Sequence, residues 1–231
     1  NEGSPSVVAF TVGSAVTPRN QGGGVHISEG GVVTRCLIQN NGSRIGGGAY
    51  IENGMLGNSL IIDNRSHFDR EHPPGYFDVP SDGGGIYIQG RGRLENCTVL
   101  GNLSSHTTGG VFWKSSFDPV DETIIRNNIL YSNSGFNLPI AAYVVTLEHN
   151  CIQDGTKLKD GNINSDPLVA EDYRLSKPSP CRDTGTNQEW MIANGDYAGI
   201  KRVVNGDVDM GALEFAAPLV ITHIQYADEQ V

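Results

Sequence analysis

The chain has 231 residues and carries a formal net charge of −10 at pH 7. This acidic balance argues against nucleic acid or an anionic membrane surface as a partner, and against polygalacturonate unless calcium mediates the contact. With 30 glycines and only 18% charged residues, the composition favours strands and tight turns over helices. Neutral glycans or proteins are the expected partners, and no stretch is apolar for long enough to predict a transmembrane segment.

A short apolar run, residues 7–10, lies near the start of the chain, and no signal peptide is recognisable before it. We therefore expect a fragment of a longer multidomain protein, monomeric within it, whose targeting signal and first coils lie upstream. The expected location is secreted or on the outer cell surface.

A glycine-rich motif recurs four times, at residues 22–27, 46–51, 83–88 and 108–113. After the glycines, each copy has a small apolar residue, which is Val25, Ala49, Ile86 or Val111. The intervals are 49−25=24, 86−49=37 and 111−86=25 residues. A period of this size predicts a solenoid with one coil for each interval and an insertion in the second.

Two columns of asparagine accompany these repeats. Asparagine tolerates the left-handed backbone angles of a sharp corner, and stacked amides can hydrogen-bond along the axis of a solenoid. The first column consists of Asn58, Asn96, Asn127 and Asn150, with Arg35 in the first coil. The second column consists of Asn41, Asn64, Asn102 and Asn133. We interpret both columns as structural.

Alternation within the glycine-motif strands predicts an outward aromatic strip. Residues two apart share one face of a strand, so Ile27 and its equivalents face the core and the residues between them point outward, about 4.8 Å apart along the axis. The strip consists of His26, Tyr50, Tyr87 and Phe112, flanked by Ser28, Glu52, Gln89 and Lys114.

Sugar rings stack on aromatic strips of this kind. The candidate ligand-binding residues are therefore His26, Tyr50, Tyr87, Phe112, Glu52 and Gln89. The alternative, which carries more weight, is that like residues stack only because neighbouring strands are in register. A binding strip also needs convergent polar groups.

The insertion, residues 65–82, is the candidate recognition loop, because function concentrates in long loops on a rigid solenoid. Its chemistry-bearing residues are His67, Asp69, Arg70, Glu71, His72, Tyr76, Asp78 and Asp82. The two histidines match no helical metal-binding spacing, and Pro73 and Pro74 forbid a helix there. A solvated loop without a metal is expected.

The four cysteines fall into two groups. Cys36 and Cys97 occupy one interior column with Ser59 between them, too far apart for a disulfide, and are expected to be free thiols. Cys151 and Cys181 flank a terminal coil, where an exported location would permit a bond. The sequence leaves open whether that bond forms.

Short motifs succeed one another in the C-terminal part. They are Gly161-Asn162-Ile163, Asp166-Pro167-Leu168, Asp172-Tyr173-Arg174-Leu175, Ser179-Pro180-Cys181-Arg182-Asp183-Thr184-Gly185 and Asp209-Met210-Gly211-Ala212-Leu213-Glu214. Together with the upstream repeats, they resemble secreted bacterial β-helix proteins of the pectin-lyase-like group, of the Bacteroidetes type with assorted C-terminal anchors. The resemblance implies an all-β fold, a right-handed single-stranded parallel β-helix of about six coils with an irregular C-terminal cap. It implies little about activity, since lyases, hydrolases, adhesins and stalks share this solenoid.

We expect one β-helix domain over residues 1–215. An open solenoid end exposes strand edges, so residues 176–215, which contain Trp190, are expected to cap it. Residues 216–231 resemble a linker followed by a strand, which either folds back or begins a following β module.

These observations favour a non-catalytic module for adhesion or carbohydrate binding, with a glycan or a host or microbial surface protein as partner. The alternatives are a polysaccharide lyase or glycoside hydrolase with its cleft beside residues 65–82, and a passive stalk. Catalysis would need paired carboxylates, or a calcium site with a basic residue. Outward charges fall at scattered positions, namely Glu52, Glu95, Lys114, Arg126 and Glu148. No catalytic residue and no cofactor is therefore assigned, and calcium is not indicated.

Overall fold

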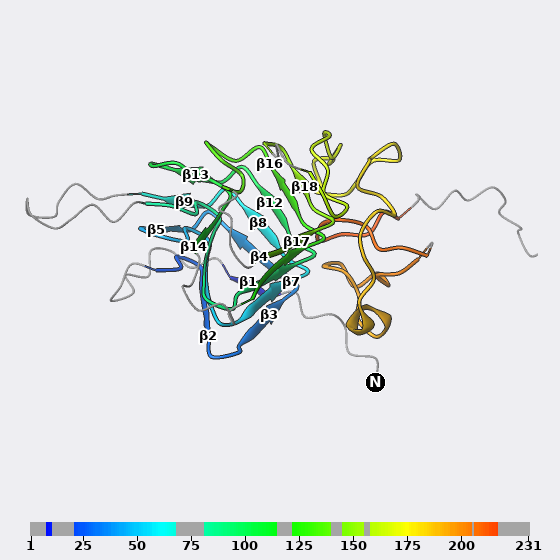
Figure 1. Ribbon diagram of the computed structural model, residues 1–231, viewed down its shortest axis with the longest axis horizontal. Coiled ribbons are helices and arrows are strands. Elements are labelled where there is room, and N and C mark those ends of the chain that lie inside the picture. Colours follow the sequence, from blue (N-terminus) through cyan, green and yellow to red (C-terminus); the bar gives the residue numbers. More distant parts are fainter. Residues whose placement is uncertain are drawn as a thin grey trace, which may run out of the picture.

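The computed structural model describes residues 8–10, 21–67, 81–114, 122–139, 145–154, 158–204 and 206–216. In these ranges the chain forms eighteen short strands and one 3-10 helix, η1 (Glu189–Ile192). The strands form four sheets, and each pairing between them is parallel. Figure 1 shows the sheets as the walls of one solenoid, with the C-terminal segment beside them. The predicted parallel β-helix is thus confirmed.

Each sheet takes its strands from successive coils. The six-stranded sheet consists of β1 (Val8–Phe10), β4 (Cys36–Gln39), β8 (Leu60–Ile62), β12 (Thr98–Leu100), β16 (Ile129–Tyr131) and β18 (Cys151–Ile152). The five-stranded sheet consists of β3 (Val32–Thr34), β7 (Met55–Gly57), β11 (Arg93–Glu95), β15 (Thr123–Arg126) and β17 (Val145–Glu148). The four-stranded sheet consists of β2 (Val25–Ser28), β6 (Ala49–Glu52), β10 (Ile86–Gln89) and β14 (Val111–Lys114). The three-stranded sheet consists of β5 (Gly42–Ser43), β9 (Arg65–Ser66) and β13 (Leu103–Ser104).

Strand register confirms the repeat alignment and the interior face. Ala49 lies opposite both Val25 and Ile86, as the glycine motifs predict. The interior column is buried and consists of Ile27, Ile51, Ile88 and Trp113. Burial of each such isoleucine contributes about 1.5–3 kcal/mol. Glycine lets the coils stack closely, since a Cβ on Gly84 would lie 2.2 Å from the carbonyl oxygen of Leu103.

The asparagine corner column is confirmed for three of its four members. Asn58, Asn96 and Asn127 have φ angles of 46°, 51° and 56°, in the left-handed region. Asn150 was assigned wrongly, because Cys151 pairs with Ile129, and this places Asn150 one position later in the coil. His149, with φ 52°, occupies the corner instead.

The second asparagine column forms a continuous buried ladder. The backbone N–H and side-chain amide of Asn64 both donate to Oδ1 of Asn102, at 2.8 and 3.0 Å. Asn102 makes the same two bonds to Asn133, both 2.9 Å. These amides satisfy one another and the backbone inside the solenoid, so their structural role is confirmed.

The irregular C-terminal segment, residues 176–204 and 206–215, lies along the flank of the solenoid. The backbone N–H of Ala212 donates to the Thr98 hydroxyl at 2.9 Å, and the Asn58 amide donates to the Gly195 carbonyl at 3.3 Å. Leu60 of β8 packs with Ala212 in a buried cluster. The segment therefore covers the outer face of the six-stranded sheet, and Figure 1 shows it as the yellow and orange chain beside the strands. Its role as a cap of the solenoid end stays a prediction.

A buried arginine organises this C-terminal segment. Arg202 is fully buried, its Nε lies 3.1 Å from Oε1 of Glu214, and its Nη2 donates to the carbonyls of Asp209 and Gly211. Burial raises the pKa of Glu214 to about 8, although the Arg202 charge opposes the shift.

Within the described ranges, no helix has the length and hydropathy needed to span a bilayer.

Candidate functional site

The predicted aromatic strip exists as a stack of rings on the outer side of the four-stranded sheet. The ring centroids of Tyr50 and Tyr87 are 5.3 Å apart with the rings 9° from parallel, and those of Tyr87 and Phe112 are 5.1 Å apart. His26 meets Tyr50 edge-on at 4.9 Å. The strand register therefore produces the expected stack.

The two central rings of the stack do not offer a flat exposed surface. Tyr50 is 2% exposed and Tyr87 is 8% exposed, and both pack with Ile45. Burial raises the pKa of Tyr87 to about 12, with smaller contributions from the charges of Tyr50 and Asp82. Only the rings at the two ends, His26 and Phe112, reach the surface to any extent, so the expectation of four exposed rings is corrected.

A row of polar side chains runs beside the stack. The register places one on each strand, and the row consists of Ser28, Glu52, Gln89 and Lys114. Their side chains are half-buried or exposed. The Tyr50 hydroxyl donates to Oε1 of Gln89 at 2.8 Å, and Nε2 of His26 lies 3.8 Å from Oε2 of Glu52. Tyr50 and His26 of the stack thus hold Gln89 and Glu52 of the row in place.

The recognition loop is described only at its two ends. Asp69, Arg70, Glu71, His72, Tyr76 and Asp78 lie outside the described residues. His67 follows β9 and lies near Gly42. Asp82 is 2% exposed and is therefore a buried group, not a solvated loop residue.

Asp82 fixes the turn that precedes β14. Its Oδ1 accepts hydrogen bonds from the backbone N–H of Thr107 and Thr108 and from the Thr107 hydroxyl. Its Oδ2 lies 3.0 Å from Nδ1 of His106, whose side chain is half exposed. The sequence interpretation missed His106, although aligning Ile86 with Val111 places Asp82 opposite Thr107, beside this histidine.

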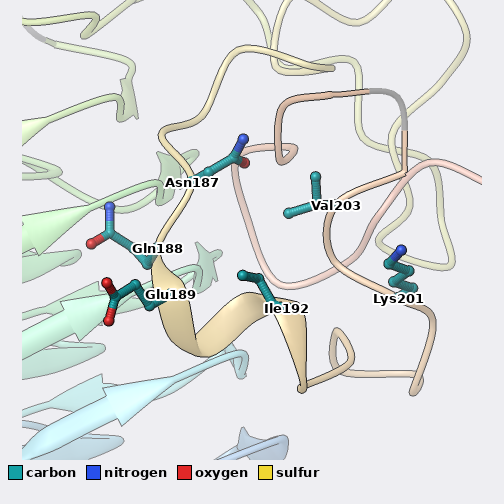
Figure 2. Close-up of a pocket in the computed structure, with 6 residues that line it drawn as sticks. All are labelled: Asn187, Gln188, Glu189, Ile192, Lys201 and Val203. Atoms are coloured by element: carbon teal, nitrogen blue, oxygen red, sulfur yellow. The ribbon is translucent and has the colours of Figure 1, made fainter.

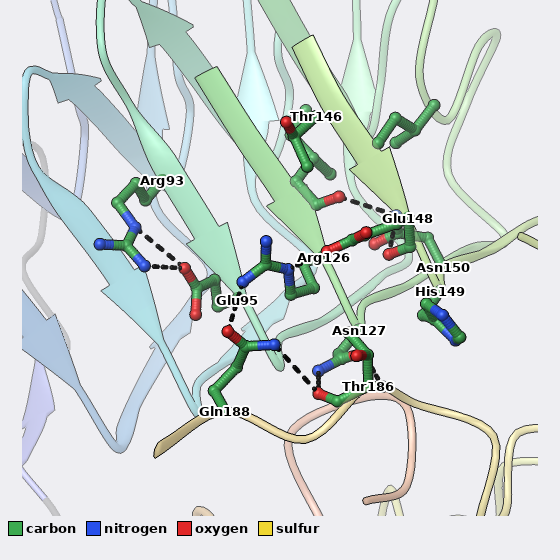
Figure 3. Close-up of polar contacts among 12 residues, drawn as sticks. Arg93, Glu95, Arg126, Asn127, Thr146, Glu148, His149, Asn150, Thr186 and Gln188 are labelled. Atoms are coloured by element: carbon green, nitrogen blue, oxygen red, sulfur yellow. Dashed lines mark hydrogen bonds and ion pairs between the residues drawn. The ribbon is translucent and has the colours of Figure 1, made fainter. Parts of the chain in front are cut away.

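The charges that looked scattered in the sequence line up on the outer face of the five-stranded sheet. Glu95, Arg126 and Glu148 lie directly opposite one another on β11, β15 and β17. Figure 3 shows this row, in which Nε of Arg126 lies 2.5 Å from Oε1 of Glu148, and Nη2 of Arg93 lies 2.5 Å from Oε1 of Glu95.

The C-terminal segment fastens onto this charged row. Nη1 of Arg126 donates to Oε1 of Gln188 at 2.7 Å, and the indole N–H of Trp190 donates to Oε2 of Glu95 at 3.3 Å. Glu95 is fully buried. Glu95 is therefore engaged by Arg93 and Trp190 and Glu148 by Arg126, which leaves the two carboxylates poorly placed to act as an acid and base pair.

A hollow of about 410 Å³ lies within the C-terminal segment, next to η1. Figure 2 shows the residues that line it, namely Asn187, Gln188, Glu189, Ile192, Lys201 and Val203. Apolar atoms make up most of the surface that faces the hollow, although four of the six residues are polar. Ile192 is 76% exposed. None of the residues predicted to bind a ligand lies here. Over the ranges that the structure describes, no group of three or more His, Cys, Asp or Glu side chains is placed to hold a metal ion.

Comparison with known proteins adds little to this description. No family model and no curated protein matches the chain. The crystal structure of pectate lyase Pel9A is similar at 15% sequence identity and a TM-score of 0.38. The similarity covers 84% of this chain and 62% of that one, so this chain spans less than two thirds of the neighbour.

Proposed function

We propose that this chain is a non-catalytic carbohydrate-binding module of a larger exported cell-surface protein. Its ligand lies along the outer face of the four-stranded sheet, across successive coils. The observation that carries this proposal is the polar row of Ser28, Glu52, Gln89 and Lys114 beside a rigid aromatic stack.

The row matches the chemistry of a linear glycan. Parallel strands present one side chain about every 4.8 Å along the axis, and a sugar chain offers hydroxyls at regular intervals in the same way. The row provides a hydroxyl, a carboxylate, an amide and an ammonium group, so both donors and acceptors are present. Phe112 and His26 supply ring surface at either end.

The test is binding to a broad glycan array, with calcium and with chelator, while released sugar ends are measured in parallel. We expect retention without product. Gln89→Ala and Glu52→Ala should each weaken binding about tenfold, because each removes one protein group that hydrogen-bonds to the ligand. Glu189→Ala, an exposed carboxylate on η1, is the matched control and should bind like the wild type.

Unchanged affinity in both row variants would place the ligand elsewhere, whether it is a glycan or a surface protein. If neither binding nor released sugar ends are detected, the passive stalk becomes the favoured function.

The second candidate function is a polysaccharide lyase or glycoside hydrolase, and the pair of Asp82 and His106 favours it. A carboxylate on Nδ1 orients an imidazole so that Nε2 can act as a general base. If the wild type releases product and His106→Gln does not, the chain is an enzyme, and the proposal of a non-catalytic binding module is wrong.

A further inference from the structure

Two of the four buried cysteines meet where the C-terminal segment contacts the last coil. Cys151 begins β18, and Cys181 lies in a turn of the C-terminal segment. Both side chains are fully buried and belong to one cluster with Ile129, Leu175 and Met210. Both are free thiols that pack in this one cluster, and the Cys151 thiol donates to the Ser165 carbonyl at 3.1 Å.

The backbone on each side fixes this meeting. The N–H of Cys151 donates to the Asn128 carbonyl at 2.8 Å, within the last turns of the solenoid. The carbonyl of Cys181 accepts from the N–H of Met210 at 2.9 Å, and its own N–H donates to the Ser179 hydroxyl at 3.2 Å. Neither cysteine can leave the contact unless the C-terminal segment detaches.

The other two cysteines lack such a contact. Cys36 and Cys97 share an interior column with Ser59 between them, two coil steps of about 4.8 Å apart, which exceeds the reach of about 7 Å between Cα atoms. The Cys36 thiol donates to the Thr34 carbonyl at 3.3 Å and the Cys97 thiol to the Glu95 carbonyl at 3.4 Å, much as Cys151 donates to Ser165. Their spacing is therefore what distinguishes them from Cys151 and Cys181. They provide an internal control for burial without pairing.

We propose that Cys151 and Cys181 form a disulfide that fastens the C-terminal segment covalently to the last coil. The oxidant is a small-molecule disulfide. The thiolate of one cysteine attacks it and releases one thiol, and the thiolate of the second attacks the mixed disulfide and releases another. Two electrons pass to the oxidant, and the two protons leave on the released thiols.

The order of events follows from burial. A thiolate is the attacking species, and the neighbouring Cys151 thiol together with burial raises the pKa of Cys181 far above its usual range. The mixed disulfide therefore forms while the C-terminal segment is still open, and the second attack completes the bond as the segment docks and brings the two cysteines together. The folded chain then shields the bond from reductants. This inference does not depend on the proposed carbohydrate binding.

The experiment refolds the whole chain in oxidised and reduced glutathione, then denatures it and alkylates the free thiols. Intact mass should show two alkylated cysteines, Cys36 and Cys97, and digestion should yield one crosslinked peptide pair containing Cys151 and Cys181. After full reduction all four should be alkylated. Wild-type protein refolded with the bond should melt on the order of 10 °C above the same protein refolded under reducing conditions.

Variants separate the bond from packing. Cys181→Ser should lose this difference in melting temperature between the two conditions, whereas Cys97→Ala should retain it even if its overall stability is lower. Four alkylated cysteines after oxidative refolding, or a crosslink that includes Cys36 or Cys97, would overturn the proposal.

Discussion

Asn102 shows how much a single side chain can do inside this solenoid. Its Oδ1 accepts from the backbone N–H and the amide of Asn64, and its own amide donates to Ile61, Leu100 and Asn133. The residue is fully buried. Buried polar groups that lose their partners pay the full cost of desolvation, so the ladder is sensitive to removal of any member.

Asn102→Ala should therefore lower the free energy of unfolding by at least about 3 kcal/mol, measured by urea denaturation. The matched control is Asn194→Ala, an exposed asparagine with one hydrogen bond to the Trp190 carbonyl. It should change stability by less than about 0.5 kcal/mol. Equal effects of the two substitutions would show that the ladder is not a stabilising feature.

Glu214 predicts a dependence of stability on pH. Its pKa rises from 4.5 to about 8, chiefly through burial, beside Arg202, Asp209 and Asp196. Between these values the folded chain holds a proton that the unfolded chain has released. Its contribution to stability is therefore complete below about pH 4.5 and is lost as the pH rises through 8.

Urea denaturation from pH 5 to pH 9 checks this dependence. The free energy of unfolding of the wild type should fall more steeply with rising pH than that of Glu214→Gln, which cannot titrate. Parallel profiles for the two proteins would contradict the assignment.

At the scale of elements, the C-terminal segment depends on a few polar anchors. Arg202 pairs with Glu214 and bonds to two carbonyls, while Gln188 and Trp190 fasten η1 to the charged row of the five-stranded sheet. Removal of Arg202 would leave the buried carbonyls of Asp209 and Gly211 without their donor, which costs the desolvation of both groups. The flank should therefore be most vulnerable at Arg202.

Arg202→Met should lower the free energy of unfolding by about 2–5 kcal/mol and increase protease cleavage within the C-terminal segment. Lys201→Met, at the exposed neighbouring position, is the control and should behave like the wild type. Unchanged cleavage and stability in Arg202→Met would show that the contacts of Arg202 do not hold the segment.

Elements that repeat could be predicted, and elements that do not repeat could not. The glycine motifs gave the correct register for Ala49 and Ile86, because stacking forces equivalent residues into line. Asn150 was misplaced by one residue, since its neighbour Cys151 imitates the Asn-Cys motif. The flank position of the C-terminal segment has no periodic signal, as it depends on single contacts such as Ala212 with Thr98.

The candidate site was predictable only in part for the same reason. Period-two alternation placed Tyr50 and Tyr87 outside the core, where they stack as expected. It could not show that both rings are covered, because alternation assigns a face but not what packs on that face. His106 lies in no repeat motif, and its partner Asp82 was taken for a loop residue.

At the scale of the whole molecule, the solenoid spaces equivalent side chains regularly along its axis. Four successive coils each add one strand to the four-stranded sheet and one polar side chain to its outer row, from Ser28 to Lys114. Because the C-terminal segment covers the six-stranded sheet, the four-stranded sheet is a separate face for a ligand. A glycan that follows the row should gain contacts with every coil it spans.

The most direct test is the affinity of a length series of the oligosaccharide that the array identifies, measured by titration calorimetry. We expect affinity to rise with each added sugar until the ligand spans β2 to β14 and then to level off, and the rise to be lost when Glu52 and Gln89 are both changed to alanine. Affinity that is independent of length, or unchanged in the double variant, would contradict binding along the outer face of the four-stranded sheet.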